Sequence, residues 1–409
     1  MPEKLPMDDL PLIPVGQGFR FLEGVRVVDL TTSIAGPYAT MMLADLGAEV
    51  IKIERPEGDD ARYWGPPFLN GESLWFASVN RGKKSIALDL TDDAGQDALR
   101  ALVQSADVFV TNQPPRVQKK LGLDYETLSS IKPDIVFTSI TGFGLSGERS
   151  DLTCYDLIAE GYSGIMDLTG TADEAPQKVG TPAADMLSGQ DAAMATIAAL
   201  FDRQKSGAGH LVDVALLDSM TRFLAPRINS YLGSGEVPRR SGGTDSVIAV
   251  YQAFDTADDP ITLGLGTNAI WQRFWTAVGN PDFAGQEGFA TNAERRVNRD
   301  EIVAVIQEQL LNKDRSHWLK IFREARVPAG PINRVDEVSA DAALQERGLI
   351  FALQDGDRVV PQVGLGVQFD GKFAIPRSAP PHLGEHTKDI LAALQAETAG
   401  VAGEEGKSS

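Results

Sequence analysis

The sequence predicts an α/β fold with a Rossmann-like, mainly parallel sheet in a large domain and a second, small α/β domain. Three observations support this prediction. Short apolar runs alternate with helical stretches through the first 140 residues, which is typical of βαβ units. The composition changes after Asp218, where residues 222–243 are rich in Gly, Pro and Arg. The 409 residues are also enough for two or three domains and a large hydrophobic core.

In chain order, five apolar runs have the length of buried strands. They are Val25–Leu30, Val50–Ile53, Ser85–Leu90, Val108–Thr111 and Ile135–Ile140, with helices expected near residues 38–46 and 92–105. Ligands of such sheets lie at the carboxyl ends of the strands, where this chain carries Ser33, Ile34, Ala35, Arg55, Asn112, Thr141, Gly142 and Phe143. The first turn lacks the spaced glycines of a dinucleotide fingerprint, so a nicotinamide or flavin cofactor has little support.

A long helix is predicted after the small-residue turn Gly180–Ala184. Apolar residues recur at helical spacing from Met186, and the glycine-rich Ser206–Gly209 ends the pattern. Asp185 is expected to be the N-cap, since aspartate is among the best capping residues. The local sequence alone therefore favours a structural role for this carboxylate. Farther on, strands are expected near residues 247–254 and 260–265, with helices around 271–278, 299–311 and 317–326.

Composition excludes several classes of function. The formal net charge of −19 disfavours nonspecific binding to nucleic acid or anionic membranes. The single cysteine, Cys154, excludes an intramolecular disulfide and fits a reducing compartment. The four histidines, His210, His317, His382 and His386, lack metal-ligand spacing, so no metal site is expected. Without a signal peptide or a membrane-spanning run, a cytoplasmic location is expected, with an organelle matrix as the open alternative.

Five segments in the same order closely resemble the family III CoA transferases, the group of formyl-CoA transferase and carnitine CoA-transferase. They are Leu22–Arg55, Gly180–Gly189, Lys205–Asp218, Val327–Pro331 and Leu383–Thr387, within a resemblance that runs from about Leu22 to Ile390. The resemblance implies that Asp185 is the nucleophile, which carries CoA from an acyl-CoA to a carboxylic acid as an aspartyl-CoA thioester. It implies no prosthetic group, because the coenzyme A thioester is a substrate.

The resemblance also implies a domain order and an oligomeric state. The C-terminal part is expected to return to the large domain, and two subunits are expected to interlock as a homodimer, with a hetero-oligomer left open. The expected boundaries are an N-terminal extension over 1–21, the large CoA-binding domain over 22–225, a linker and the small domain over 226–335, the returning segment over 336–395 and a disordered tail over 396–409.

Positive side chains near the predicted strands are candidate partners for the phosphates of CoA. From the residues alone these candidates are Arg55, Arg81, Lys83, Lys84, Arg116, Lys119 and Lys120. The resemblance favours Arg55 and Lys120 as phosphate or adenine contacts, and Lys120 stands where formyl-CoA transferase has arginine. It further implies backbone or packing contacts from Ile34, Ala35, Asn112 and Gln113, contacts to the pantetheine arm from Thr141, Gly142 and Phe143, and a place in the site for Tyr155, Gly242 and Gly243.

Two departures from formyl-CoA transferase concern the substrate. Ile34 stands where that enzyme has glutamine, and Ser241–Thr244 is shorter than its tetraglycine loop. An apolar side chain removes hydrogen-bonding capacity near the acyl group, so the acceptor is expected to be larger than formate or oxalate. Succinyl-CoA is the expected donor, because it is the frequent donor in the family.

Alternatives remain open at this point. The fold also houses α-methylacyl-CoA racemases, which use a histidine and a glutamate where this chain has Tyr155 and Gln252, and tyrosine is a poor proton acceptor near pH 7. A noncatalytic subunit of a hetero-oligomeric transferase is another possibility, although the retained Asp185 argues against it. His386 is interpreted as a residue of a polar loop, and Cys154 as a packing residue.

Overall fold

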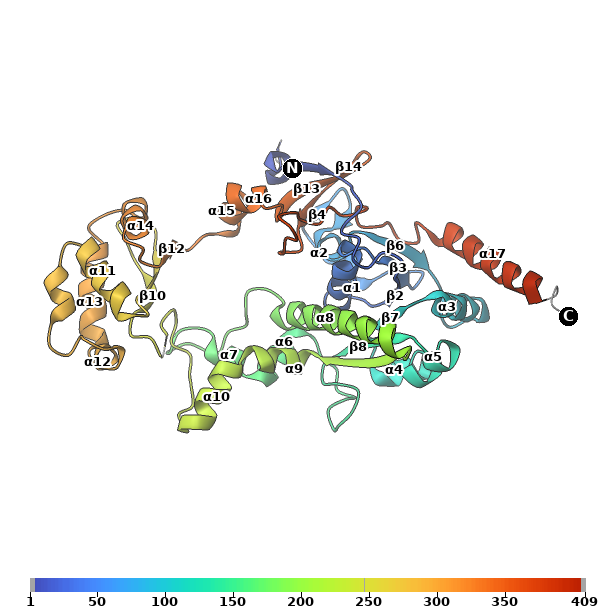
Figure 1. Ribbon diagram of the computed structural model, residues 1–409, viewed down its shortest axis with the longest axis horizontal. Coiled ribbons are helices and arrows are strands. Elements are labelled where there is room, and N and C mark those ends of the chain that lie inside the picture. The colour runs from blue at the N-terminus through green and yellow to red at the C-terminus, as the bar shows by residue number, and fades with distance from the viewer. Residues whose placement is uncertain (1–3, 246, 406–409) are drawn as a thin grey trace. The chain divides into compact units, whose positions relative to one another are not determined.

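The computed structural model describes residues 4–245 and 247–405 of the chain (Figure 1). Contacts within this part divide it into two compact units. Within the described residues, unit 1 comprises the segment that ends at Ser163, residues 179–225 and the segment that begins at Ser339. Unit 2 comprises Gly164–Lys178 and Pro226–Val338. Residues 164–178 thus group with unit 2, whereas the sequence analysis placed them in the large domain.

Unit 1 is built on a six-stranded sheet in which all neighbouring strands are parallel. Its order is β6-β3-β2-β7-β8-β9, with β2 Arg26–Leu30, β3 Glu49–Glu54, β6 Lys83–Ala87, β7 Val108–Thr111, β8 Val136–Thr141 and β9 His210–Ala215. The predicted parallel sheet is confirmed, while the edge strand β9 was not predicted because polar residues interrupt its apolar pattern. The order of the strands reverses between β2 and β7, and ligands of doubly wound sheets bind at the carboxyl ends beside such a point.

Helices cover both faces of this sheet. On one face, Thr40 of α1 (Ala35–Asp45) donates to Asp29 of β2, and Thr196 of α8 (Ala183–Ser206) bonds to Thr138 of β8, each at 2.7 Å. Side chains alternate along a strand, so the neighbours of these two strand residues point to the opposite face. There they form an apolar core with α3 (Asp93–Ser105), α5 (Tyr125–Ile131) and α17 (Thr387–Glu405).

The ends of the chain are built into unit 1. β1 (Leu12–Pro14) pairs in parallel with β13 (Ile350–Asp355), which forms an antiparallel pair with β14 (Arg358–Val363). Residues 382–387 then run along the free edge of β6, where the backbone N–H of His386 donates to Ser85 O at 2.9 Å. α17 continues through Glu405, so residues 396–405 are helical rather than disordered as predicted, because they extend a helix that already begins at Thr387. Residues 406–409 of the predicted tail lie outside the described residues.

The remaining elements of unit 1 are short. They are η1 Pro6–Asp9, η2 Asp60–Tyr63, β4 Phe68–Leu69, β5 Glu72–Ser73, α2 Leu74–Ser78, α4 Pro115–Leu121, α6 Asp156–Ser163, α9 Leu216–Phe223 and α16 Ala342–Glu346. None of the helices in the described ranges combines the length and the apolarity needed to cross a bilayer.

Unit 2 has an antiparallel sheet of β10 (Tyr251–Phe254), β11 (Ile261–Gly264) and β12 (Ala329–Pro331). Its core is aromatic, with Trp271, Phe274 and Trp275 fully buried. The first two strands fall within the predicted ranges, and a helix over 225–234 occupies part of the predicted linker. The helices of this part are α7 Ile165–Leu168, α10 Ala225–Ser234, α11 Asn268–Ala277, η3 Pro281–Gly285, α12 Asn292–Val297, α13 Arg299–Leu310, α14 Arg315–Glu324 and α15 Val335–Ser339.

Candidate active site

Asp185 lies in the first turn of α8, at its third helical position. The helix begins at Ala183 with Pro182 as the N-cap, so the prediction that Asp185 caps the helix is wrong. The capping oxygen comes instead from Asp156, at the start of α6, whose Oδ1 accepts the N–H of Ala184 at 2.8 Å and of Asp185 at 3.2 Å. Asp156 of α6 therefore has the capping role that the sequence analysis assigned to Asp185.

The carboxylate of Asp185 is left available by this arrangement. Among the residues that the structure describes, no side chain or backbone group forms a hydrogen bond or ion pair with it. The residue is half-buried, so the group is partly desolvated and still reachable. Burial, and then the negative charge of Asp156, raise the pKa of Asp185 to about 7. The side chain is consequently present in both protonation states near neutral pH.

Asp156 was missed by the sequence analysis. An acidic residue directly after Tyr155 and before the apolar Leu157 and Ile158 marks a helix start, and this was the only local signal. Nothing in the sequence shows that its carboxylate reaches a second helix, because Asp156 and Asp185 are separated by 29 residues.

The Asp156→Asn variant tests this assignment through the pH profile. With a pKa of about 7, roughly a tenth of Asp185 is ionised at pH 6. Asparagine keeps an oxygen for the two N–H groups and removes the charge, so the pKa of Asp185 should fall. We expect the rising limb of kcat/KM to move to lower pH, and activity at pH 6 to rise severalfold relative to pH 8. An unchanged pH profile would show that the charge of Asp156 does not raise the pKa of Asp185.

The end of β8 meets the same region. A Cβ atom at Gly142 would lie 2.1 Å from Cys154 Cβ, so only glycine permits this close approach. Burial, and then the charge of Asp185, raise the pKa of the Cys154 thiol to about 11. A thiol that stays protonated is a poor nucleophile, which agrees with the interpretation of Cys154 as a packing residue. Thr141–Phe143, Cys154 and Asp185 are thus brought together.

Aromatic side chains border this region. The ring of Phe143 packs edge-on against Tyr162 at a centroid distance of 5.1 Å. Tyr155, next to the cap residue Asp156, has 68% of its surface exposed. Phe143 and Tyr155 were both predicted for the site, and Tyr155 offers an exposed aromatic surface next to the residue that caps α8.

The start of α1 packs against α8 one turn beyond Asp185. A Cβ atom at Gly189 would lie 2.5 Å from the carbonyl oxygen of Ala35, so the two helices nearly touch here. Ile34 and Ala35 are buried, with 3% and 4% of their surfaces exposed. The structure therefore places this predicted pair of residues beside the helix that carries Asp185.

A cavity of about 340 Å³ lies at the carboxyl ends of β2, β3, β6 and β7. Its lining includes Thr32, Arg55 and Gln113, and it reaches Leu121, which comes directly after the exposed Lys120 at the end of α4. Arg55 forms an exposed ion pair with Asp60, and pairs of this kind contribute only about 0–1 kcal/mol. An anionic ligand could therefore take the place of Asp60 on this guanidinium at little cost.

The side chain of Asn112 is bound to the backbone of Thr32. Its Oδ1 accepts the backbone N–H of Thr32 at 3.0 Å, and its Nδ2 donates to Thr32 O at 2.7 Å. The carboxamide is thus engaged with the chain itself. Gln113, the next residue, lines the cavity.

Two of the candidate phosphate partners are ruled out by burial. Arg81 is fully buried and bonds to Asp45, while Lys83 is 1% exposed and donates to Asp29 at 3.0 Å. Both side chains point into unit 1, so neither can reach a ligand in solvent. The other three unassigned candidates, Lys84, Arg116 and Lys119, have exposed side chains.

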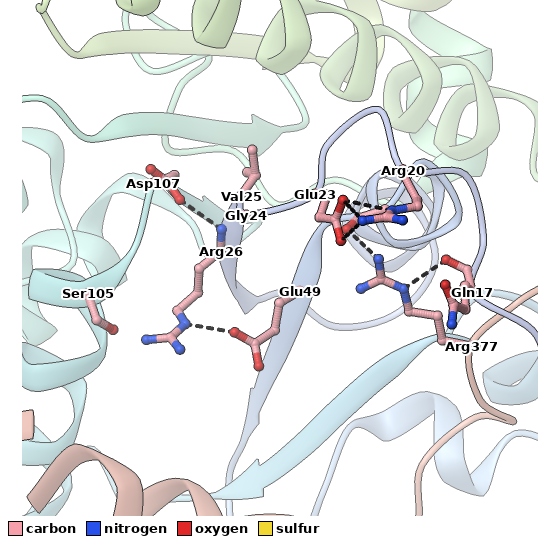
Figure 2. Close-up of a pocket in the computed structure, with 11 residues that line it drawn as sticks. Gln17, Arg20, Glu23, Gly24, Val25, Arg26, Glu49, Ser105, Asp107 and Arg377 are labelled. Carbon is pink, nitrogen blue, oxygen red and sulfur yellow. Dashed lines mark hydrogen bonds and ion pairs between the residues drawn. The ribbon is translucent and has the colours of Figure 1, made fainter. Parts of the chain in front are cut away.

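A larger cavity, of about 590 Å³, lies at the opposite end of the strands (Figure 2). It adjoins the amino ends of β2 and β3, away from the ends where ligands of doubly wound sheets bind. Its arginines have protein partners: Arg20 pairs with Glu23, Arg26 pairs with Glu49, and Arg377 donates to backbone carbonyls. This balanced lining gives no reason to place the reaction there.

The remaining residues singled out in the sequence belong to other segments of the chain. Gly242 and Gly243 belong to unit 2, where the N–H of Gly242 donates to Gly170 O at 2.8 Å. His386 lies along the edge of β6, and its Nδ1 accepts the N–H of Ser85 at 3.2 Å. Over the described residues, no group of three or more His, Cys, Asp or Glu side chains could hold a metal ion.

Comparison with known proteins gives one consistent result. The model of the family described as CoA-transferase family III matches residues 22–387. The chain is 39% identical to succinyl-CoA:glutarate CoA-transferase of Mus musculus, covering 90% of this chain and 85% of the relative. It is also 39% identical to succinate–glutarate CoA-transferase of Agrobacterium fabrum, covering 91% of this chain and 96% of the relative.

A solved structure agrees with these sequence matches. The crystal structure of a CaiB/BaiF family protein from Brucella suis is 39% identical in sequence and superposes with a TM-score of 0.82. The match covers 91% of this chain and 99% of that chain.

Proposed function

Because the chain belongs to CoA-transferase family III and is therefore a CoA-transferase, we propose that Asp185 is the nucleophile that carries CoA from donor to acceptor. The observation that carries this proposal is the half-buried carboxylate of Asp185, which has no partner among the described residues. An aspartate that only stabilised the helix would accept backbone N–H groups, and here Asp156 accepts them.

The proposed reaction consists of four acyl transfers. The Asp185 carboxylate attacks the carbonyl carbon of the donor thioester, the C–S bond breaks, and CoA leaves as a thiolate while a mixed anhydride of Asp185 and the donor acid forms. The thiolate attacks the Asp185 carbonyl of that anhydride, which releases the donor acid as a carboxylate and leaves an aspartyl-CoA thioester. The acceptor carboxylate then attacks this thioester, and the same two steps run in reverse. No proton is gained or lost overall.

The environment of Asp185 supports this chemistry. A carboxylate whose pKa is raised to about 7 is more basic than an ordinary aspartate, and a more basic group is a stronger nucleophile once it is ionised. Above neutral pH the residue is largely ionised, so the side chain is then both charged and more nucleophilic than an ordinary aspartate. The dipole of α8 stabilises negative charge near its first turn, typically by about 0.3–1 kcal/mol.

We further propose succinyl-CoA as the donor and glutarate, or another dicarboxylic acid of similar length, as the acceptor. Two relatives at 39% identity are named for succinate or succinyl-CoA together with glutarate. A panel of carboxylic acids incubated with succinyl-CoA, read by mass spectrometry of the CoA products, tests this choice.

For the rest of the substrate, we propose that the CoA nucleotide occupies the cavity lined by Arg55 and Gln113, near Lys120, and that the pantetheine arm passes Thr141–Phe143. We also propose an interlocked homodimer. Unit 1 exposes several large apolar side chains on or beside α8, namely Met194, Phe201, Leu211 and Phe223. Sedimentation velocity of the purified chain tests the dimer, and a monomer at micromolar concentration would exclude it. The single Cys154 agrees with the expected cytoplasmic location, which cell fractionation tests.

Trapping the intermediate tests the mechanism directly. Hydroxylamine added to enzyme and succinyl-CoA should convert Asp185 to a hydroxamate, because an aspartyl thioester is electrophilic and a free carboxylate is not. The modified tryptic peptide should span Val179–Arg203. The matched controls omit the donor or use Asp185→Asn, and neither should be labelled. Labelling confined to Cys154, or an unlabelled peptide under turnover, would contradict the proposal.

A further inference from the structure

We propose that Asn112 is a positioning residue, which holds the loop between β2 and α1 in the conformation that CoA transfer requires. This inference deepens the proposed function, since it concerns the same site. It starts from the unusual number of side chains that fix three successive residues of this loop, Thr31, Thr32 and Ser33.

Each of these three residues is bound by a side chain from a different part of unit 1. The carbonyl of Thr31 accepts from Lys52 Nζ at 2.7 Å. The N–H and C=O of Thr32 are both paired with the carboxamide of Asn112, at 3.0 and 2.7 Å. The N–H of Ser33 donates to Asp59 Oδ1 at 3.0 Å. The loop is therefore held from the ends of β3 and β7, the strands that flank β2.

The backbone of Ser33 explains why such support is needed. Its φ is +69°, in the left-handed region that residues other than glycine rarely adopt. A residue in this region persists when its surroundings hold it there, and such positions gather at functional sites. Without the bonds on either side, Ser33 would relax to a negative φ and turn the start of α1 away.

The loop leads directly into the part of α1 that meets the nucleophile's helix. Ala35 contacts Gly189 of α8, one turn beyond Asp185, and Thr32 itself lines the cavity with Arg55 and Gln113. The loop therefore connects the region of Asp185 with the cavity proposed for the nucleotide. A shift of about 1 Å in such a connecting segment can lower a rate roughly a hundredfold.

Asn112 lies where a shift of the loop would change the site most. It comes directly after β7 and binds Thr32, the second residue after β2, and these two strands flank the point at which the strand order reverses. Chains that leave the sheet at this point diverge to opposite faces, so a crevice opens between them. The Asn112–Thr32 pair spans that crevice and fixes its two sides relative to one another.

The chain contains a matched control for this arrangement. Asn292, in unit 2, accepts the N–H of Ala249 at 3.0 Å and donates to Val247 O at 2.9 Å, so it likewise has two bonds to backbone. Both asparagines are half-buried. Asn112→Ala and Asn292→Ala should therefore lower the melting temperature by similar amounts.

Activity should separate the two variants. We expect Asn112→Ala to lower kcat for succinyl-CoA and glutarate by roughly ten- to a hundredfold, and Asn292→Ala to leave it within about twofold. Asn112→Asp, which can accept from Thr32 N–H but cannot donate to Thr32 O, should fall between Asn112→Ala and the unaltered protein. Equal activity in the two alanine variants would overturn the inference.

A second variant tests the role of Ser33 and remains informative if Asn112→Ala is unstable. Glycine adopts a positive φ without strain, so Ser33→Gly should make the loop depend less on its partners. Adding Ser33→Gly to Asn112→Ala should restore about fivefold of the lost kcat, whereas Ser33→Ala should restore none. If Ser33→Gly changed kcat by the same factor in the wild type and in Asn112→Ala, Asn112 would not hold Ser33.

These results are separable from the proposed mechanism. Hydroxamate formation asks whether Asp185 is the nucleophile, whatever holds the loop. The comparison of Asn112 with Asn292 asks whether the loop must be held, whichever residue is the nucleophile. Labelled Asp185 with equal activity in the two alanine variants would overturn only the inference about Asn112.

Discussion

Replacing Asp185 by asparagine is expected to abolish CoA transfer, on the order of a thousandfold or more in kcat, while making the protein more stable above pH 7. An amide has nearly the shape of the carboxylate but cannot attack a thioester as a carboxylate nucleophile. The backbone N–H groups of the first turn keep their acceptor, because Asp156 supplies it. The loss of activity should therefore come without loss of the helix.

The stability change results from the raised pKa of Asp185. In the unfolded chain an aspartate ionises near its ordinary value of 3.8, whereas in the folded protein the pKa of Asp185 is about 7. Between these values the folded state binds more protons, so this residue makes the wild type less stable as pH rises. Above pH 7 the free energy of unfolding of the wild type is lower than that of Asp185→Asn by at most about 4 kcal/mol. Solvent screening makes the difference smaller, because the side chain is half-buried.

Melting curves from pH 4 to pH 8 measure this effect. Asp185→Asn should melt higher than the wild type at pH 8, and the gap should narrow towards pH 4. Asp185→Ala should be as inactive as Asp185→Asn. If Asp185→Asn kept activity and Asp185→Ala merely unfolded, the carboxylate would have a structural role after all.

Replacing Arg81 by methionine should have the largest effect on folding, lowering the free energy of unfolding by about 3–5 kcal/mol. The guanidinium is fully buried and bonds to Asp45, to Gln362 Oε1 at 3.0 Å and to Val363 O at 2.7 Å. Methionine retains much of the apolar volume but leaves the carboxylate of Asp45 buried without its partner. Removing one member of a buried pair is costly for this reason.

Urea unfolding monitored by circular dichroism measures the change. Arg100→Met is the matched control, because Arg100 pairs with Asp97 on an exposed helix face and should contribute about 0–1 kcal/mol. A stable Arg81→Met protein with a raised KM for succinyl-CoA would favour the phosphate contact expected from the sequence. Because Arg81 is buried, we expect instead that the folded fraction of Arg81→Met has an unchanged KM for succinyl-CoA.

The sequence was most informative where one physical signal dominates. Strands such as β7 and β8 are buried on both faces, so their apolar runs are continuous and were located to within a residue or two. The long helix that carries Asp185 was also predicted, because apolar residues recur at helical spacing, although the local sequence favoured a capping role for this residue and only the family resemblance implied a nucleophile. The edge strand β9 has a mixed pattern of burial, and it was missed.

Features that depend on distant residues could not be read in this way. Arg81 and Lys83 look like surface charges in a polar stretch, and only the fold shows the buried acids that receive them. The cap of α8 comes from 28 residues earlier in the chain, which no local pattern reveals. The same is true of Asn112, whose partner Thr32 is 80 residues away.

The segment along the edge of β6 has a consequence for synthesis on the ribosome. His386 and Ser85 bond to each other across 301 residues of chain. At roughly 5–20 residues per second, translation of that interval takes about 15–60 seconds, during which the segment that covers the outer edge of β6 has not been made. Unpaired strand edges invite pairing with other chains. The nascent protein should therefore depend on chaperones in this interval, and a chain truncated before Gly384 should aggregate even though its sheet is otherwise complete.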